Sequence, residues 1–182
     1  MRDAGVAFRW LEGEGIEGRH WEFFNRCYRA TYAAHGSSPY LSLEFFRRLG
    51  SALPQNTAMV VAEREGQPIA AALYLRDETT LYGRYWGAIE RVPLLHFECC
   101  YYQAIQYAIA RGLLFFEGGA QGEHKLFRGL LPVEVLSAHW LAHPQFARAI
   151  DDFLVREGAG IESYLDELNE RRPFKAEATA DE

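Results

Sequence analysis

Hydrophobic and polar residues follow two different periods along the first part of the chain. Residues 6–11 are largely apolar and predict a first strand. Between residues 17 and 35, aromatic side chains recur at spacings of three and four, as on one face of a helix. The residues of this stripe are Trp21, Phe24, Tyr28 and Tyr32. We interpret the stripe as a face buried in the core, with a ligand-stacking surface as the alternative.

A second helix and a set of strands follow. Glycine, serine and proline at residues 36–39 end the first helix, and Ser42 suits the N-cap of the next one. The residues expected on its buried side are Phe45, Phe46 and Leu49. Three stretches rich in strand-forming residues come next, at residues 57–65, 69–76 and 79–88. Because short turns link them, they predict an antiparallel meander.

The helical period returns after Pro93, which opens a predicted helix over residues 94–111 that Gly112 ends. A short apolar strand follows at residues 113–117. A helix that joins two strands in this way makes a right-handed crossover, which places the strands parallel. We therefore predict an α/β fold, with a mixed sheet made of an antiparallel meander plus one parallel βαβ pair and with helices on both faces.

The remainder of the chain has a mixed pattern. It predicts a short helix near Glu123, a strand over residues 133–140 and a helix over residues 144–157. The helical pattern resumes at residues 161–172, after a glycine-containing break at residues 158–160.

Length and composition are those of a globular protein. The 182 residues, 49% of them hydrophobic, fit one domain over residues 1–175, with a disordered tail at residues 176–182. A formal charge of -6 argues against wholesale nucleic-acid binding, although it is compatible with a local basic groove.

Cysteine usage and apolar runs indicate the compartment. The cysteines Cys27, Cys99 and Cys100 are odd in number and two are adjacent, which favours reduced thiols in a cytoplasm. No apolar run approaches the ~18 residues of a membrane span. Residues 1–10 lack the apolar core of a signal peptide. We expect a cytoplasmic protein.

The segment of residues 117–129 has the highest density of reactive groups. Its thirteen positions hold four glycines and five ionisable side chains, directly after an apolar strand. Glycines let a backbone approach a ligand, and α/β proteins build sites at the carboxyl ends of buried strands. We interpret the segment as the lining of a functional site, with a solvated turn as the alternative. Its glycine and lysine spacing is not that of a P-loop.

Four stretches, taken together and in order, resemble a known family. They are Tyr85-Trp86-Gly87, residues 95–103, residues 117–129 and Ser137-Ala138-His139-Trp140. As a set they are similar to the FemAB-like family of predicted N-acyltransferases, also called peptidoglycan biosynthesis/recognition proteins. The likeness runs from about residue 20 to about residue 157. The order of elements is similar to that of the GNAT acyltransferase fold, so the resemblance implies a GNAT-like domain.

The resemblance implies transfer of an acyl or aminoacyl group to an amine of a small-molecule or peptide acceptor. GNAT enzymes hold the pyrophosphate of coenzyme A with a glycine-rich loop at a helix N-terminus. The corresponding residues 87–93 have one glycine and end in a proline, which has no N–H. Acyl-CoA and aminoacyl-tRNA, with tRNA as the carrier, therefore both stay open as donors. Family members usually have two GNAT-like domains, and this chain resembles the C-terminal one. A non-catalytic substrate-recognition half is the alternative function.

Three residues are candidates for acid–base catalysis. Glu117 and His124 are the preferred pair. Glu117 is in phase with Leu113, so we expect it at the rim of an apolar pocket, where burial would raise its pKa; an exposed strand end is the alternative. His139 would approach Glu117 if its predicted strand neighbours the strand that Glu117 ends; a core histidine is the alternative.

Other residues are candidates for binding. Lys125 and Arg128 stand three positions apart and would clamp an anionic group, with a solvated helix face as the alternative. The remaining candidates for substrate or donor binding are Tyr85, Trp86, Gly87, His96, Glu98, Gly118, Gly119, Gln121 and Gly122.

His96, Cys99 and Cys100 share one side of a predicted helix. Such residues bind zinc in other proteins, but no fourth ligand stands at a familiar spacing, and we predict no metal site. A thiol nucleophile activated by His96, as in a thiol-dependent hydrolase, is a second interpretation. Small apolar core residues are the third.

Overall fold

The computed structural model describes residues 4–119, 123–171 and 173. The chain divides into two compact units, Met1–Ala120 and Gln121–Glu182, and each is described by itself. The expectation of one domain over residues 1–175 stays a prediction. The predicted tail at residues 176–182 lies outside the described residues.

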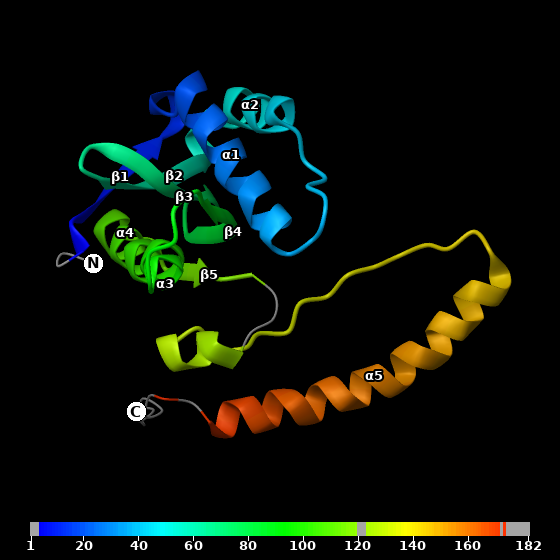
Figure 1. The fold of residues 1–182 in the computed structure, drawn as a ribbon. Helices are drawn as coiled ribbons and strands as arrows, with labels where there is room; N and C mark the ends of the chain where they lie inside the picture. Colours follow the sequence, from blue (N-terminus) through cyan, green and yellow to red (C-terminus); the bar gives the residue numbers. More distant parts are fainter. Residues whose placement is uncertain (1–3, 120–122, 172, 174–182) are drawn as a thin grey trace. The chain divides into compact units, whose positions relative to one another are not determined.

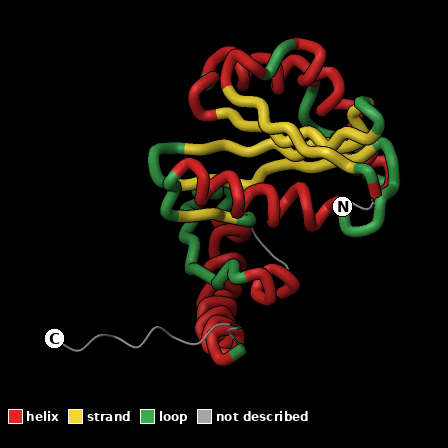
Figure 2. Tube along the Cα trace, turned by 90° about the vertical axis from the view of Figure 1, so that its left-hand side faces the viewer, coloured by secondary structure: helices red, strands yellow, loops and turns green. Residues whose placement is uncertain are grey.

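The first unit is built on a five-stranded mixed sheet (Figures 1 and 2). Its strands follow the chain in the order β1-β2-β3-β4-β5, and the first four pair antiparallel while β5 pairs parallel to β4. The strands are β1 (Val6–Glu12), β2 (Thr57–Arg64), β3 (Gln67–Arg76), β4 (Thr80–Ala88) and β5 (Phe115–Glu117). The predicted meander and parallel pair are therefore confirmed.

Helices cover both faces of this sheet, as Figure 2 shows. One face packs against α1 (Gly18–Ala34) and α2 (Leu43–Ala52) in a core cluster that includes Phe24, Phe46 and Met59. The other face packs against the crossover helix. That helix consists of α3 (Leu95–Phe97), a π-helical turn (Glu98–Tyr102) and α4 (Gln103–Arg111). Strand β2 is buried on both faces except at its end, because apolar side chains meet a helix layer on either side.

Local signals set several element boundaries. The Ser42 hydroxyl accepts a hydrogen bond from the Phe45 N–H at 3.1 Å, which confirms the predicted N-cap. Gly112 ends the crossover helix with φ +67°, a conformation that glycine adopts without strain. Of the predicted buried side of α2, Phe46 is fully buried, whereas Phe45 is 42% exposed.

The π-helical turn anchors the crossover helix to the sheet. A π-turn widens the helix and takes backbone groups out of the α-helical hydrogen-bond pattern. The hydroxyl of the buried Tyr74, on β3, donates to the carbonyl of Cys99 within this turn. The bond joins the first half of the helix to the sheet, and the His96 ring there meets Trp86 near the end of β4.

The second unit contains a 3₁₀ helix (Glu123–Arg128) and the helix α5 (Pro144–Glu170). The helix expected near Glu123 is confirmed. The strand expected over residues 133–140 is wrong: these residues are exposed and outside any ladder, and alternation alone forms no strand without a pairing partner. The break expected at residues 158–160 is also wrong. A glycine costs about 1 kcal/mol relative to alanine inside a helix, too little to end one of this length.

No described helix combines the length and the apolar character that a crossing of the bilayer requires.

Candidate functional site

The pairing of strands β4 and β5 covers only the first part of β4. Their pairing ends at Tyr82 with Glu117, and in the described part of the chain no strand pairs with β4 on that side beyond this point. The two backbones are neighbours there: a Cβ placed on Gly83 would lie 3.4 Å from the Glu117 carbonyl oxygen, at ordinary van der Waals distance. Gly119 has φ +75°, a backbone conformation that favours glycine. The backbone of β4 after Gly83 therefore has no strand partner on the β5 side within the described residues.

A β-bulge lies at the start of this open stretch. Leu73 pairs with Tyr85 and Tyr74 pairs with Gly83, so Arg84 is the additional residue of the bulged strand. Bulges leave a residue outside the ladder and re-aim its side chain, and they occur frequently beside active sites. Arg84 is exposed, and its guanidinium carbon lies 5.7 Å from the centre of the Tyr82 ring.

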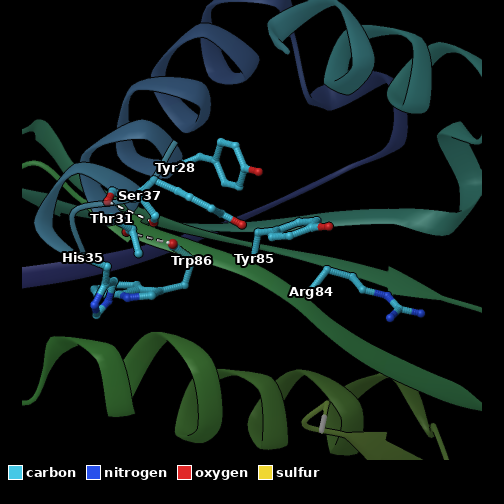
Figure 3. A pocket seen from close by; sticks show the side chains of 8 residues that line it. Tyr28, Thr31, His35, Ser37, Arg84, Tyr85 and Trp86 are labelled. Atoms are coloured by element: carbon cyan, nitrogen blue, oxygen red, sulfur yellow. Dashed lines mark hydrogen bonds between the residues drawn. The ribbon is translucent and has the colours of Figure 1, made fainter. Parts of the chain in front are cut away.

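A pocket of about 410 Å³ lies beside the bulge, between α1 with its following loop and β4 (Figure 3). This volume falls in the range of small-molecule sites, roughly 300–1,000 Å³. Its lining residues are Tyr28, Thr31, Tyr32, His35, Ser37, Arg84, Tyr85 and Trp86. The pocket is therefore walled by aromatic rings and carries hydroxyl and basic groups.

The aromatic rings of the pocket hold one another in place. The ring centre of Tyr28 lies 4.8 Å from that of Tyr32 and 5.4 Å from that of Tyr85. The hydroxyls of Tyr85 and Tyr40 share a hydrogen bond of 2.7 Å. Burial, together with this bond, raises the pKa of Tyr85 above its ordinary value of 10.0, so its phenol stays protonated. The wall is a pre-formed surface with hydrogen-bonding tips.

The Tyr28 hydroxyl is an exception in this cluster. Tyr28 is 1% exposed, and its hydroxyl makes no hydrogen bond of normal geometry within the described residues, although it lies close enough to Tyr32 to raise the pKa of that phenol. A buried polar group without a partner costs about 1–3 kcal/mol. Native structures seldom keep such a group without a reason, and a bound ligand atom is one.

The pocket floor is fixed by direct contact between α1 and β4. A Cβ placed on Gly87 would lie 2.1 Å from the carbonyl oxygen of Cys27, so the helix packs on the strand backbone itself. The Thr31 hydroxyl donates to the Trp86 carbonyl at 3.1 Å. The structure thus places Gly87, which we expected at a ligand, in a buried helix–strand contact.

The first unit brings several predicted site residues together. Tyr85 and Trp86 line the pocket. The ring of His96 meets that of Trp86 edge-on, with 5.2 Å between their centres. Glu98 accepts a hydrogen bond from the Gln103 side chain at 2.9 Å.

Glu117 and its two following glycines stand at the point where the strands part. Gly118 and Gly119 lie beside Gly83 of β4. Glu117 is exposed, while its neighbour Phe116 packs against the core. The expected burial of Glu117 in an apolar pocket is wrong, because its phase along β5 is the solvent-facing one. Its catalytic role stays a prediction.

The other predicted catalytic residues belong to the second unit. His124 is exposed, and its carbonyl accepts a hydrogen bond from Arg128 at 2.6 Å. Lys125 is half-buried. His139 is exposed, and its Nε2 lies 3.1 Å from the Ser137 hydroxyl. The proposed pairing of His139 with Glu117 stays a prediction, and Gln121 and Gly122 lie outside the described residues.

The cysteine interpretations can be weighed by burial. Burial raises the pKa of Cys99 to about 12, and it does the same for Cys27. The thiolate is the nucleophile, so such thiols are inert near neutral pH. Across the residues that the structure describes, no three His, Cys, Asp or Glu side chains are grouped to hold a metal ion. Cys99 therefore fits the interpretation as a small core residue.

Sequence reasoning missed most of the pocket. It did not select Thr31, His35, Ser37 or Arg84, and it interpreted Tyr28 and Tyr32 as part of a core stripe. The available signal was the chemistry of that stripe: Trp and Phe occupy its first half, and tyrosines with polar tips occupy its second.

Solved structures define the class of fold. An aminoglycoside acetyltransferase from an uncultured soil metagenomic sample, in complex with trehalose, has a TM-score of 0.53 and 14% identity, over 79% of this chain and 99% of that one. A probable acetyltransferase has a TM-score of 0.51 and 9% identity, over 76% and 97%. The C-terminal domain of a putative lysylphosphatidylglycerol synthetase from Agrobacterium fabrum has a TM-score of 0.50 and 12% identity, over 63% and 36%. The chain has the GNAT acyltransferase fold.

The family is given by sequence. The chain matches, over residues 1–176, the FemAB-like family described as peptidoglycan biosynthesis/recognition, and it belongs to that family. The comparison with curated proteins found no match.

Proposed function

We propose that this chain is an N-acyltransferase that transfers an acyl or aminoacyl group to an amine acceptor, in a step connected with peptidoglycan. One observation carries the proposal: β4 opens away from β5 directly beside a pre-formed aromatic pocket. Acyl transfer is accelerated when donor and acceptor are held together and N–H donors face the developing oxyanion. The family description and the fold support the same class of reaction.

The open stretch of β4 suits the electrostatic part of this reaction. The acceptor nitrogen attacks the acyl carbon, the bond from that carbon to the donor's oxygen or sulfur breaks, the amine loses a proton to a base, and the leaving group gains one. Negative charge develops on the acyl oxygen, and a backbone N–H there is typically worth 10²–10³ in kcat. The bulge at Arg84 takes backbone groups of β4 out of the ladder, where they can serve this purpose.

We assign the role of general base, which accepts the proton of the amine, to Glu117. His124 and His139 are further candidates for this role. Glu117 ends β5 at the point of divergence, next to the glycines that border the opening. General-base catalysis contributes typically 10²–10⁴-fold. Lys125 and Arg128 are proposed to bind an anionic group of the donor or the acceptor. A transfer assay that offers both acyl-CoA and aminoacyl-tRNA decides the donor class.

The test is a transfer assay with the whole chain. Acetyl-CoA and an aminoacyl-tRNA are each offered with peptidoglycan peptides and with simple amino acids, and the acylated amine is detected by mass spectrometry. The proposal expects an acylated product with one donor class. Absence of product with both classes, from a chain whose melting temperature shows that it is folded, would overturn it.

The Glu117→Gln variant then tests the base. Because Glu117 is exposed at a strand end, the variant should keep the melting temperature of the parent. We expect kcat to fall by roughly 10²–10⁴-fold. Glu44→Gln, an exposed carboxylate on α2 that pairs with Arg48, is the matched control and should keep full activity. A parental rate in Glu117→Gln would remove Glu117 from the mechanism.

A non-catalytic recognition half is the second candidate function. It is favoured by the exposure of Glu117, since ordering an exposed side chain for catalysis costs conformational entropy. As a recognition half, the chain would bind an amine acceptor in the pocket and form no product. Binding by calorimetry without turnover in the transfer assay would select this function.

A further inference from the structure

The charge of the pocket lining restricts its ligand. Among the eight lining residues there is one guanidinium, from Arg84, and one imidazole, from His35, and none of the eight is acidic. A polycationic amine would find no counter-charge in such a lining. The pocket instead suits a ligand that carries a negative charge.

Arg84 is equipped to bind that charge. In the described part of the chain it makes no ion pair, and it lies over the Tyr82 ring. Stacking uses the flat face of a guanidinium and leaves the N–H groups at its edge available for a planar acceptor. A carboxylate accepts two such N–H groups side by side.

Two phenol groups add hydrogen-bonding capacity. The buried Tyr28 hydroxyl, beside Tyr32, makes no hydrogen bond of normal geometry among the described residues, and the Tyr85 hydroxyl is already oriented by Tyr40. In Figure 3 the hydroxyls of Tyr28 and Tyr85 point toward the same side of the view as the guanidinium of Arg84, and His35 lies at the opposite end. These two hydroxyls and the guanidinium therefore lie toward one end of the aromatic wall, and Thr31, Ser37 and His35 lie toward the other.

We propose that the pocket binds an acceptor amine that also carries a carboxylate, as an amino acid or a peptide does. Arg84 pairs with the carboxylate, the Tyr28 hydroxyl bonds a second polar atom, and the tyrosine rings contact the apolar body. A single guanidinium matches a monoanion better than a phosphate dianion, which places carboxylate ahead of phosphate. That the ligand is an acceptor of the acyl group rests on the proposed function. The preference of the pocket for a carboxylate does not depend on it.

The test is a binding series with matched probes. Tyrosine, tyrosinamide and tyramine share one ring and one amine, and only tyrosine has a carboxylate. Spermidine and 2-aminoethyl phosphate represent the polycationic and the phosphate-bearing alternatives. A ligand that binds only the native state raises the melting temperature of the whole chain, and calorimetry gives its Kd.

The expected order is tyrosine ahead of all other probes, by tenfold or more over tyrosinamide. Arg84→Gln should abolish this preference, and Arg84→Lys should restore part of it. Arg48→Gln, an arginine on α2 that pairs with Glu44 outside the pocket, is the control and should keep the preference. Equal binding of tyrosine and tyrosinamide, tighter binding of spermidine or of 2-aminoethyl phosphate, or no binding by any probe would overturn the proposal.

Tyr28→Phe separates a ligand-directed hydroxyl from a structural one. Removing a buried hydroxyl that makes no hydrogen bond of normal geometry should leave the melting temperature of the free chain unchanged or higher. The same change should weaken the binding of tyrosine several-fold. A lower melting temperature with unchanged binding would show that the hydroxyl serves the fold and would remove it from the site.

Failure of this inference and failure of the proposed function give different results. Acyl transfer with equal kcat/KM for tyrosine and tyrosinamide would support the proposed enzymatic function and reject recognition of the carboxylate. Carboxylate-selective binding without any acylated product would keep the pocket assignment and discard catalysis.

Discussion

The pocket between α1 and β4 and the glycine-and-charge segment of residues 117–129 differ in how they are held. Pocket rings such as Tyr28 and Tyr85 are packed against one another and against Phe46. In the segment, by contrast, Glu117 and His124 are exposed. The segment also crosses the boundary between the two compact units, whereas the pocket lies within the first.

The difference suggests that the pocket recognises the acceptor and that the segment of residues 117–129 takes part in the chemical step. Side chains already fixed by packing lose little freedom when a ligand binds, so the pocket is suited to select an acceptor. Exposed charged side chains lose more freedom when they are ordered. We therefore expect the segment to reach its working geometry only with both substrates bound. Changes in the pocket should act on the fold and on binding, and changes in the segment on turnover.

The largest effect is expected from Gly87→Val. The new side chain would collide with the backbone carbonyl of Cys27, which a helix cannot move aside cheaply. Overpacking typically costs 1–3 kcal/mol and occasionally more, and a clash with backbone belongs at the upper end. Thermal unfolding followed by circular dichroism should show a much lower melting temperature and loss of ligand binding.

Gly158→Ala is the matched glycine control for that experiment. A Cβ on Gly158 meets nothing within 4 Å, and the residue lies inside α5. Alanine should favour the helix by about 1 kcal/mol or less. A parental melting temperature for Gly87→Val would contradict the direct contact between α1 and β4.

Cysteine reactivity tests whether the two core clusters of the first unit, one with Cys27 and one with Cys99, are closed to solvent. Burial raises the pKa of Cys27 and of Cys99 from 9.0 to about 12, so their thiolate fraction near pH 8 is roughly 10³-fold lower than in the unfolded chain. Iodoacetamide followed by peptide mass spectrometry should modify both slowly in the folded protein and rapidly after denaturation. Rapid modification of folded Cys99 would return a thiol nucleophile to consideration.

A smaller effect is expected from acid. Hydrogen bonds from the Thr79 N–H and then the Tyr82 hydroxyl lower the pKa of Asp77 from 3.8 to about 2. A lowered pKa stabilises the fold above the ordinary value, and this stabilisation is lost as the pH falls from about 4 toward 2. Since Arg84 lies over Tyr82, acid should also loosen this end of the pocket.

Asp77→Asn is the variant that isolates this contribution. Melting temperatures measured between pH 2 and pH 5 should depend less on pH in the variant than in the parent. Identical pH profiles for the two proteins would show that Asp77 does not hold the start of β4.

The fold could be predicted from the sequence because its determinants are local. Ser42 and Gly112 mark helix ends, and tight turns make the meander antiparallel. The strand at residues 133–140 could not be judged in this way, since alternation does not reveal whether a pairing partner exists. The pocket was missed for a related reason: Tyr28 and Tyr85 lie far apart in sequence, and only the packing of α1 on β4 makes them neighbours.

The kinetics of Arg84→Gln and Glu117→Gln test the central claim most directly. With a carboxylate-bearing amine as acceptor, the account predicts that Arg84→Gln raises KM at least tenfold with kcat little changed, and that Glu117→Gln lowers kcat with KM little changed. Loss of kcat without a change of KM in Arg84→Gln would contradict the account, because acceptor recognition would then lie outside the pocket beside β4.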